Sequence, residues 1–248
     1  MGFTFSHPAL ILPAKQLPRR YYSFTGLFVG SIVPDFEYFI SLHKESVLSH
    51  TWYGAIIFDL PLAIILALGY HQLIRDTLIA NLPSYFNRRL SRFQGVDWPA
   101  YFRKHTGMVC ASILAGTFTH FLWDSFTSIN GYFVGILPAL TVELHIGGIT
   151  FYVYKLVKHL TSLLGAGFIV WEFNRLRVAK ACTKKGQRFF WPLFVLLGTG
   201  LLIVLIYVQP PPKTYNHYVK TAITSGLVSL LFTALVFRKR KKPNHERC

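Results

Sequence analysis

Long apolar runs alternate with short basic segments along most of this chain. Six of the runs come close to the roughly 20 residues that a helix needs to cross a bilayer. The predicted spans are residues 21–42, 51–74, 105–126, 147–171, 189–208 and 219–237. The pattern predicts an all-α fold, a polytopic membrane helix bundle with about six transmembrane helices.

Two further apolar stretches are too short to span a bilayer. Residues 3–14 and residues 132–142 are therefore predicted to form re-entrant or interfacial segments. The ionisable residues of the apolar runs concentrate upstream of about residue 172. We expect a helical core with a metal site at residues 1–172, followed at residues 173–248 by two anchoring transmembrane helices and a basic C-terminal tail.

The placement of the basic residues indicates the orientation. The net charge of +16 could suggest a nucleic-acid partner, but hydrophobic residues make up 52 % of the chain and charged residues only 15 %. Lys and Arg cluster between the apolar runs, as they do in loops that flank a membrane. With six spans, the N-terminal stretch, residues 75–104, residues 173–188 and the tail all fall on one side. We therefore expect an integral membrane protein with both termini cytoplasmic and no nucleic-acid partner.

The strongest chemical signal is His120 with Asp124, near the end of the third apolar run. Helix positions i and i+4 share one face, with Cβ atoms roughly 5–6 Å apart. An imidazole and a carboxylate placed in this way can bind one divalent cation. Ionisable groups inside a membrane are costly and usually face a bundle interior or a watery cavity. The alternative interpretation is a structural hydrogen bond between neighbouring turns.

Other ionisable residues are predicted at a similar depth, toward the non-cytoplasmic side. Three or four His and Asp donors suit zinc, and an open coordination position permits catalysis. Asp35 and His50 have an alternative interpretation as helix caps, and Glu143 and His145 as solvated interfacial residues. The further candidates at this depth are Asp35, His50, Glu143 and His145.

Two histidines need a special path to such a site. His7 precedes a proline in the first short apolar stretch, while Lys15, Arg19 and Arg20 should remain cytoplasmic. A half-helix that re-enters the membrane would bring His7 to the other donors, since ten helical residues cover roughly 15 Å. For His159, inside the fourth span, a ligand role and a role in lining a polar cavity both remain open.

Several motifs in a fixed order resemble a bacterial membrane family catalogued as a domain of unknown function. The similarity covers most of residues 3–172. This chain has Ser128 where that family has a histidine, so a ligand or proton carrier is missing or replaced. The motifs are Phe3-Thr-Phe-Ser-His-Pro8, Gly30-Ser-Ile-Val-Pro-Asp-Phe-Glu-Tyr38, Ser49-His50-Thr51, His120-Phe-Leu-Trp-Asp-Ser-Phe-Thr127 and Tyr154-Lys-Leu-Val-Lys-His159, followed by Ser162-Leu-Leu-Gly165.

This pattern is similar to membrane-bound metal-dependent hydrolases and, more distantly, to soluble zinc-dependent phospholipase C. The resemblance implies a divalent metal, zinc in the first place, in a bacterial cytoplasmic membrane. If two metals lie roughly 3.5–4 Å apart, Asp124 or Asp35 is the natural bridge between them, which makes these carboxylates the candidate catalytic residues. The implied metal ligands are His7, Asp35, His50, His120, Asp124 and His159.

The leading hypothesis is a membrane hydrolase in which a bound cation lowers the pKa of a water molecule toward 7 and supplies hydroxide. A site near the headgroups suits a membrane lipid, a phosphoester or a lipid-like substrate. Two alternatives belong to other classes of protein. One is a small transporter or lipid-handling protein that uses buried His and Asp for ion coupling. The other is a non-catalytic scaffold with a structural metal.

Overall fold

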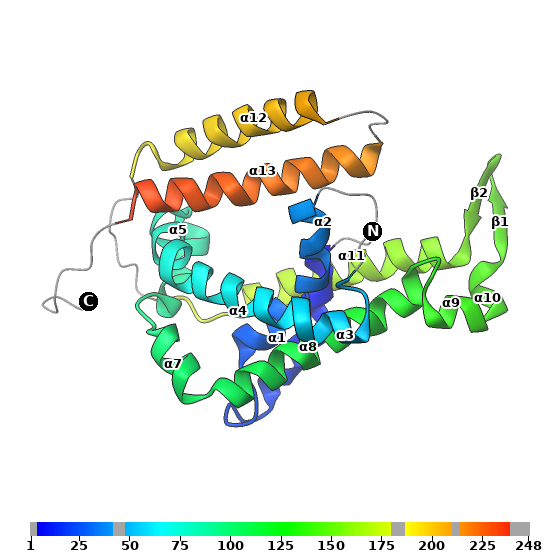
Figure 1. Ribbon diagram of the computed structural model, residues 1–248, viewed down its shortest axis with the longest axis horizontal. Coiled ribbons are helices and arrows are strands. Elements are labelled where there is room, and N and C mark those ends of the chain that lie inside the picture. The colour runs from blue at the N-terminus through cyan, green and yellow to red at the C-terminus, as the bar shows by residue number, and fades with distance from the viewer. Residues whose placement is uncertain (1–3, 42–47, 180–186, 210–213, 239–248) are drawn as a thin grey trace, which may run out of the picture. The chain divides into compact units, whose positions relative to one another are not determined.

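The protein divides into two compact units in a computed structural model that describes residues 4–41, 48–179, 187–209 and 214–238 (Figure 1). Unit 1 comprises residues 1–37, 45–65 and 105–175. Unit 2 comprises residues 38–44, 66–104 and 176–248. The predicted basic C-terminal tail lies, except for its first residue Arg238, outside the described residues.

Within the described residues, five helices are long and apolar enough to cross a membrane. They are Trp52–Asn81, Thr106–Ile136, Val153–Asn174, Phe190–Val208 and Tyr215–Val236. These helices confirm the predicted all-α membrane bundle and identify an integral membrane protein.

Unit 1 contains short helical segments around two long helices. The short segments are the 3₁₀ helices η1 (Thr4–Gln16) and η2 (Val33–Asp35), the α-helices α1 (Phe24–Gly30), α3 (Trp52–Gly54), α9 (Tyr132–Ile136) and α10 (Pro138–Thr141), and the π-helical turn η3 (Ala55–Asp59). The long helices are α8 (Thr106–Thr127) and α11 (Val153–Asn174), and the strands are β1 (Glu143–Ile146) and β2 (Ile149–Tyr152). Helices α2 (Phe36–Ser41) and α4 (Leu60–Gly69) each begin in unit 1 and continue into unit 2.

The first predicted span differs from the structure. Residues 21–42 do not form one continuous helix, because α1 ends at Gly30 and the chain continues through η2 into α2. Pro34 lies inside η2 and has no amide proton to donate, which interrupts the hydrogen-bond ladder of a continuous α-helix. The break turns Asp35 inward, where it is buried.

Helices α1 and α8 approach so closely that they leave no room for side chains at their contact. A Cβ atom at Gly30 would lie 2.1 Å from the carbonyl oxygen of Ile113. A Cβ atom at Gly116 would lie 2.3 Å from the carbonyl oxygen of Leu27. Small residues at the contact allow such close backbone approach between membrane helices. This packing fixes the position of α8 along its own axis relative to the C-terminus of α1.

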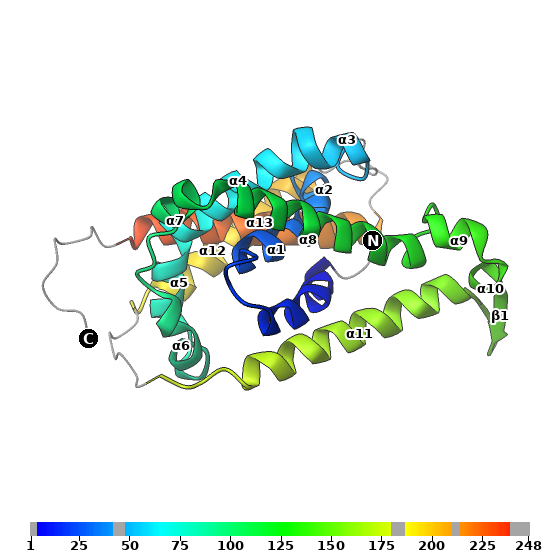
Figure 2. The same ribbon diagram turned by 90° about the horizontal axis from the view of Figure 1, so that it is seen from below.

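The N-terminal segment η1 packs against α8 and against α11, beside which it lies in Figure 2. Pro8 and Pro13 lie inside it and each lacks the amide proton that an α-helical bond requires. Lys15 near its end forms an ion pair with Glu172 of α11. The N-terminal stretch is therefore helical, as a 3₁₀ helix held against α11, and its predicted re-entry into the membrane stays a prediction.

The predicted fourth span begins later than expected. Residues 143–152 form an antiparallel hairpin in which Ile146 pairs with Ile149, and α11 starts only at Val153. Gly147 and Gly148 occupy the turn with φ angles of 59° and 79°. Glycine accepts positive φ without strain, so this pair favours a tight two-residue hairpin over a helix start.

Unit 2 contains a pair of long helices, α12 (Phe190–Val208) and α13 (Tyr215–Val236), which lie side by side (Figure 1). Ser229 of α13 donates a hydrogen bond of 2.6 Å to the carbonyl oxygen of Phe194 on α12. The remaining elements of this unit are η4 (Tyr70–Ile74), α5 (Arg75–Asn81), α6 (Ser84–Leu90), η5 (Ser91–Phe93) and α7 (Trp98–Lys104).

Candidate metal centre

His120 is oriented by the close packing of α1 and α8. It is fully buried, and its Nδ1 lies 2.9 Å from the carbonyl oxygen of Ser31, the residue that caps α1. A carbonyl oxygen only accepts hydrogen bonds, so Nδ1 is the protonated nitrogen. In the neutral imidazole, Nε2 then presents a lone pair. It is buried and makes no hydrogen bond within the described residues.

His7 is held in the same way by η1. Its Nδ1 lies 3.1 Å from the carbonyl oxygen of Thr4, one 3₁₀ turn earlier. Its buried Nε2 likewise has no hydrogen-bond partner in the described part of the chain. The ring stacks on that of His120, with centroids 4.2 Å apart and planes 15° apart. Two imidazoles therefore direct their Nε2 atoms, which carry a lone pair in the neutral ring, into one region.

Two carboxylates and a third imidazole meet these nitrogens. Asp124 Oδ1 lies 3.5 Å from His7 Nε2, and Asp124 Oδ2 lies 3.5 Å from His50 Nε2 and 3.7 Å from His120 Nε2. Asp35 Oδ1 lies 3.8 Å from His120 Nε2. Ligands of a tetrahedral zinc ion, each about 2.0–2.1 Å from the metal, lie about 3.4 Å from one another. The distances between the donor atoms are thus close to those between the ligands of a bound zinc ion.

The donors form two overlapping groups. His7, Asp35 and His120 make one, and His50, His120 and Asp124 make the other, with the ligand atoms of each group within 4.8 Å of one another. His120 is common to both and has only one free lone pair, at Nε2. A single ion near His120 Nε2 is therefore the simplest occupant of the combined site.

Asp35 and His50 are each held by a neighbouring segment. The hydroxyl of Thr4 donates to Asp35 Oδ2, so η1 orients this carboxylate as well as His7. Glu37 accepts hydrogen bonds from the amide of Ser49 at 2.8 Å and from its hydroxyl at 2.5 Å. His50 follows directly. Glu37 therefore fixes the backbone that carries the third imidazole.

The electrostatics of His50 favour positive charge in this region. Burial alone would lower the pKa of His50. The interaction with Asp124 and the negative charge of Asp35 outweigh burial, and the pKa is raised above its ordinary value. A divalent cation would supply the same positive charge between the imidazole and the carboxylates.

Asp59 is a third buried carboxylate near the centre. It ends the π-helical turn η3, which packs against η2 and α8, and its negative charge also acts on His50. Neither carboxylate oxygen has a hydrogen-bond partner among the described residues. π-helical turns are frequent at functional sites. The sequence signal that could have identified Asp59 is a carboxylate inside an apolar run, where an ionisable group is costly.

Five of the six ligands that the sequence resemblance implied come together, from four different segments of unit 1. His159 does not join them, since it is exposed on α11 and belongs to neither group. Glu143 and His145 are exposed on the hairpin. Ser128 is the residue that follows the last turn of α8. The five residues brought together are His7, Asp35, His50, His120 and Asp124.

Glu37 and the Ser31 carbonyl group, like Asp59, are features of the site that the sequence alone did not indicate. Glu37 lies two residues after Asp35, within the motif that carries this aspartate. Its hydrogen bonds to Ser49 join that motif to the one containing His50. The two motifs are thus joined in two ways. Each contributes a candidate ligand, and a hydrogen bond between them holds the backbone next to His50.

Comparison with known proteins places the chain in a family. Neither the curated proteins nor the solved structures that were compared with it gave a match. The model of a domain of unknown function, DUF4184, matches residues 1–238 and so includes every donor of the centre. The chain belongs to the DUF4184 family.

Proposed function

We propose that this protein is a membrane-embedded hydrolase that uses one divalent cation, zinc in the first place, to cleave a phosphoester or lipid-like substrate. The observation that carries the proposal is the orientation of His7 and His120. Each imidazole directs an unprotonated Nε2 toward carboxylate oxygens. Lone pairs on both sides repel unless a cation or a proton lies between them.

The charge balance supports a cation. Asp35 and Asp59 are buried and Asp124 is largely buried. Within the described residues, none of the three forms an ion pair with Lys or Arg. Uncompensated carboxylates are very costly in an apolar environment. A divalent cation bound by neutral histidines would compensate most of this charge.

The chemistry that such a site supports is hydrolysis, because a zinc ion held there would lower the pKa of water toward about 7. His7, His120 and Asp35 would hold the ion from the enclosed side. Asp124, on the more exposed side, would accept the proton of the attacking water. Attack would form a new P–O bond and break the ester P–O bond, and the leaving oxygen would take up the proton that Asp124 had accepted.

Metal analysis of the full-length protein in detergent tests the first half of this proposal. We expect about one zinc ion per chain after purification or reconstitution, and loss of the ion in His120→Ala. His159→Ala is the matched control, because its imidazole is exposed on α11, and it should retain the metal. Failure of the unsubstituted protein to bind zinc, manganese or iron would contradict the proposal.

Turnover tests the second half. The zinc-loaded protein should release product from phosphodiesters with a chromogenic leaving group, supplied in a water-soluble form and in a form with a hydrophobic chain, and Asp124→Asn should abolish this release. A protein that binds zinc and is stabilised by it, but cleaves no phosphoester, would instead be a scaffold with a structural metal.

A further inference from the structure

We infer that the substrate is a membrane lipid whose hydrophobic chain lies against an aromatic rim of Trp52, Phe118 and Phe121 while its headgroup ester reaches the metal centre. The inference rests on the proposed function and narrows it, because it chooses a lipid within the bilayer over a water-soluble phosphoester. It also identifies the side of the centre through which the substrate enters.

The donors differ in exposure, and the difference defines an open side. The side chains of His7 and His120 are 1 % and 0 % exposed, and that of Asp35 is 5 % exposed. Those of His50 and Asp124 are 26 % and 20 % exposed. Among the described residues, the side formed by His50 and Asp124 is thus the exposed approach to the ion.

Aromatic rings extend outward from this open side. The ring of Phe121 is 6.2 Å from that of His50 and 5.7 Å from that of Trp52. The ring of Phe118 follows at 6.3 Å from Trp52. Trp52 is 71 % exposed and Phe118 is 51 % exposed, so both present apolar surface to the surroundings. The rim runs without interruption from a candidate ligand to the outer surface of unit 1.

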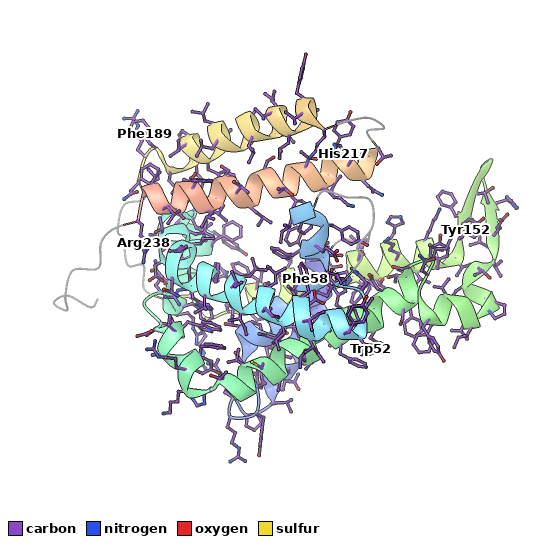
Figure 3. All side chains as sticks on the ribbon, viewed as in Figure 1. Trp52, Phe58, Tyr152, Phe189, His217 and Arg238 are labelled. Atoms are coloured by element: carbon purple, nitrogen blue, oxygen red, sulfur yellow. The ribbon has the colours of Figure 1, made fainter. Side chains whose placement is uncertain are left out.

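The position of Trp52 sets the depth of the opening. It is the first residue of the candidate span Trp52–Asn81, and it is labelled at the start of that helix in Figure 3. Tryptophan is enriched where a membrane span meets the headgroups. His50, two residues earlier, therefore lies at headgroup depth. A lipid beside the rim would bring the ester of its headgroup to the ion.

The apolar character of the rim separates two sources of the ester. Tyr53 is exposed as well and carries a hydroxyl group, but the exposed residues one turn further along this span, Ile56 and Ile57, are apolar. They offer nothing to a small hydrophilic phosphoester. They offer contact area to an acyl or isoprenoid chain, and that contact grows with each methylene that it covers.

Binding of two phosphonate lipids that resist hydrolysis tests the inference. The probes share one headgroup and carry either two 18-carbon or two 4-carbon chains. The zinc-loaded, full-length protein in mixed micelles should bind the long-chain probe at least about tenfold more tightly. Trp52→Ala/Phe118→Ala should remove most of this preference without changing the affinity for the short-chain probe. Phe118→Ala alone should shift it in the same direction.

Tyr207→Ala/Phe232→Ala is the matched control, since it also removes two exposed rings but from α12 and α13. It should leave both affinities unchanged, and all variants should retain their zinc. Equal binding of the two probes, or a chain preference that survives the rim substitutions, would overturn the inference. Chain-dependent binding without hydrolysis of the corresponding phosphoester lipid would overturn the hydrolase and leave the lipid site standing.

Discussion

Two helix pairs in this protein pack through small residues, and only one of them supports a cluster of ionisable groups. In the α1/α8 pair, Gly30 and Gly116 bring the backbones into contact, and His120 bonds to the end of α1. In the α12/α13 pair, Gly198 of α12 faces Ser229 of α13, with a Cβ at Gly198 coming no closer than 3.6 Å. The first contact is tighter, and it determines where an imidazole lies.

The polar groups buried in the two pairs also differ in kind. Most polar groups that α13 buries are neutral hydroxyls, such as that of Thr221, which donates a hydrogen bond of 2.8 Å to the carbonyl oxygen of His217 in its own helix. Such hydroxyls are common between membrane helices and need no ligand. The one buried cation of α13 in the described part of the chain, Lys220, lies over the ring of Tyr38 at 4.2 Å. The α8 face buries an imidazole nitrogen beside two carboxylates. Burial of polar groups therefore indicates a site only where it involves ionisable groups that do not satisfy one another.

Of the substitutions that test this difference between the two helix pairs, Gly30→Ala should have the largest effect on stability and zinc binding. The added Cβ meets the backbone of Ile113 at 2.1 Å, so α1 and α8 must separate. We expect a loss of about 1–3 kcal/mol in stability, typical of overpacking, together with loss of bound zinc. Thermal unfolding in detergent and metal analysis would measure both effects.

Gly198→Ala is the control for the other helix pair. Its Cβ would make an ordinary contact with Ser229, so unfolding temperature and zinc content should both stay near those of the unsubstituted protein. Equal effects of the two substitutions would show that the α1/α8 contact has no special role in placing His120.

The sequence predicted which side chains would come together better than it predicted the contacts that hold them. Helical spacing placed His120 and Asp124 on one face, and this required only local geometry. The cost of ionisable groups in a membrane also drew attention to Asp35. The bond from His120 to the Ser31 carbonyl depends on the packing of α1 against α8, which no local pattern specifies.

The errors in element boundaries have equally local causes. Hydropathy alone extended one span through Pro34 and another across the Gly147–Gly148 turn, although proline and paired glycines each favour an interruption. His159 is placed by the phase of α11, which leaves it exposed. That phase depends on which face of α11 packs against η1, and sequence spacing does not determine this.

A substitution at Glu37 should weaken the centre while keeping the α1/α8 contact. Gln at this position retains the size of the side chain but replaces the charged carboxylate, which accepts hydrogen bonds from Ser49, by a neutral amide. Changes in residues that orient metal ligands commonly lower metal affinity by about 10–100-fold. We expect a loss in this range for Glu37→Gln, measured by competition with a zinc chelator.

Glu143→Gln provides the matched control. The substitution removes the same charge, but from a side chain that is exposed on the hairpin. It should leave zinc affinity unchanged. A similar loss in both variants would indicate a general effect of net charge instead of a loss of support for His50.

Asn at Asp59 should have the smallest effect on affinity and should separate stability from binding. The buried carboxylate makes no hydrogen bond in the described part of the chain, so neutralising it should raise the unfolding temperature of the metal-free protein. Its charge also attracts a cation across a region of low dielectric constant. Zinc affinity should therefore fall, by less than about tenfold, because no donor of the centre is removed.

These opposite shifts distinguish the centre from the packing of α13, where the buried hydroxyls carry no charge. Asp97→Asn is the control, since Asp97 caps the start of α7 through its bond to the amide of Ala100 and lies in unit 2. It should lower stability slightly and leave zinc affinity unchanged. If Asp59→Asn instead lowered stability and left affinity unchanged, Asp59 would be a packing residue, and the excess negative charge that favours a cation would be confined to Asp35 and Asp124.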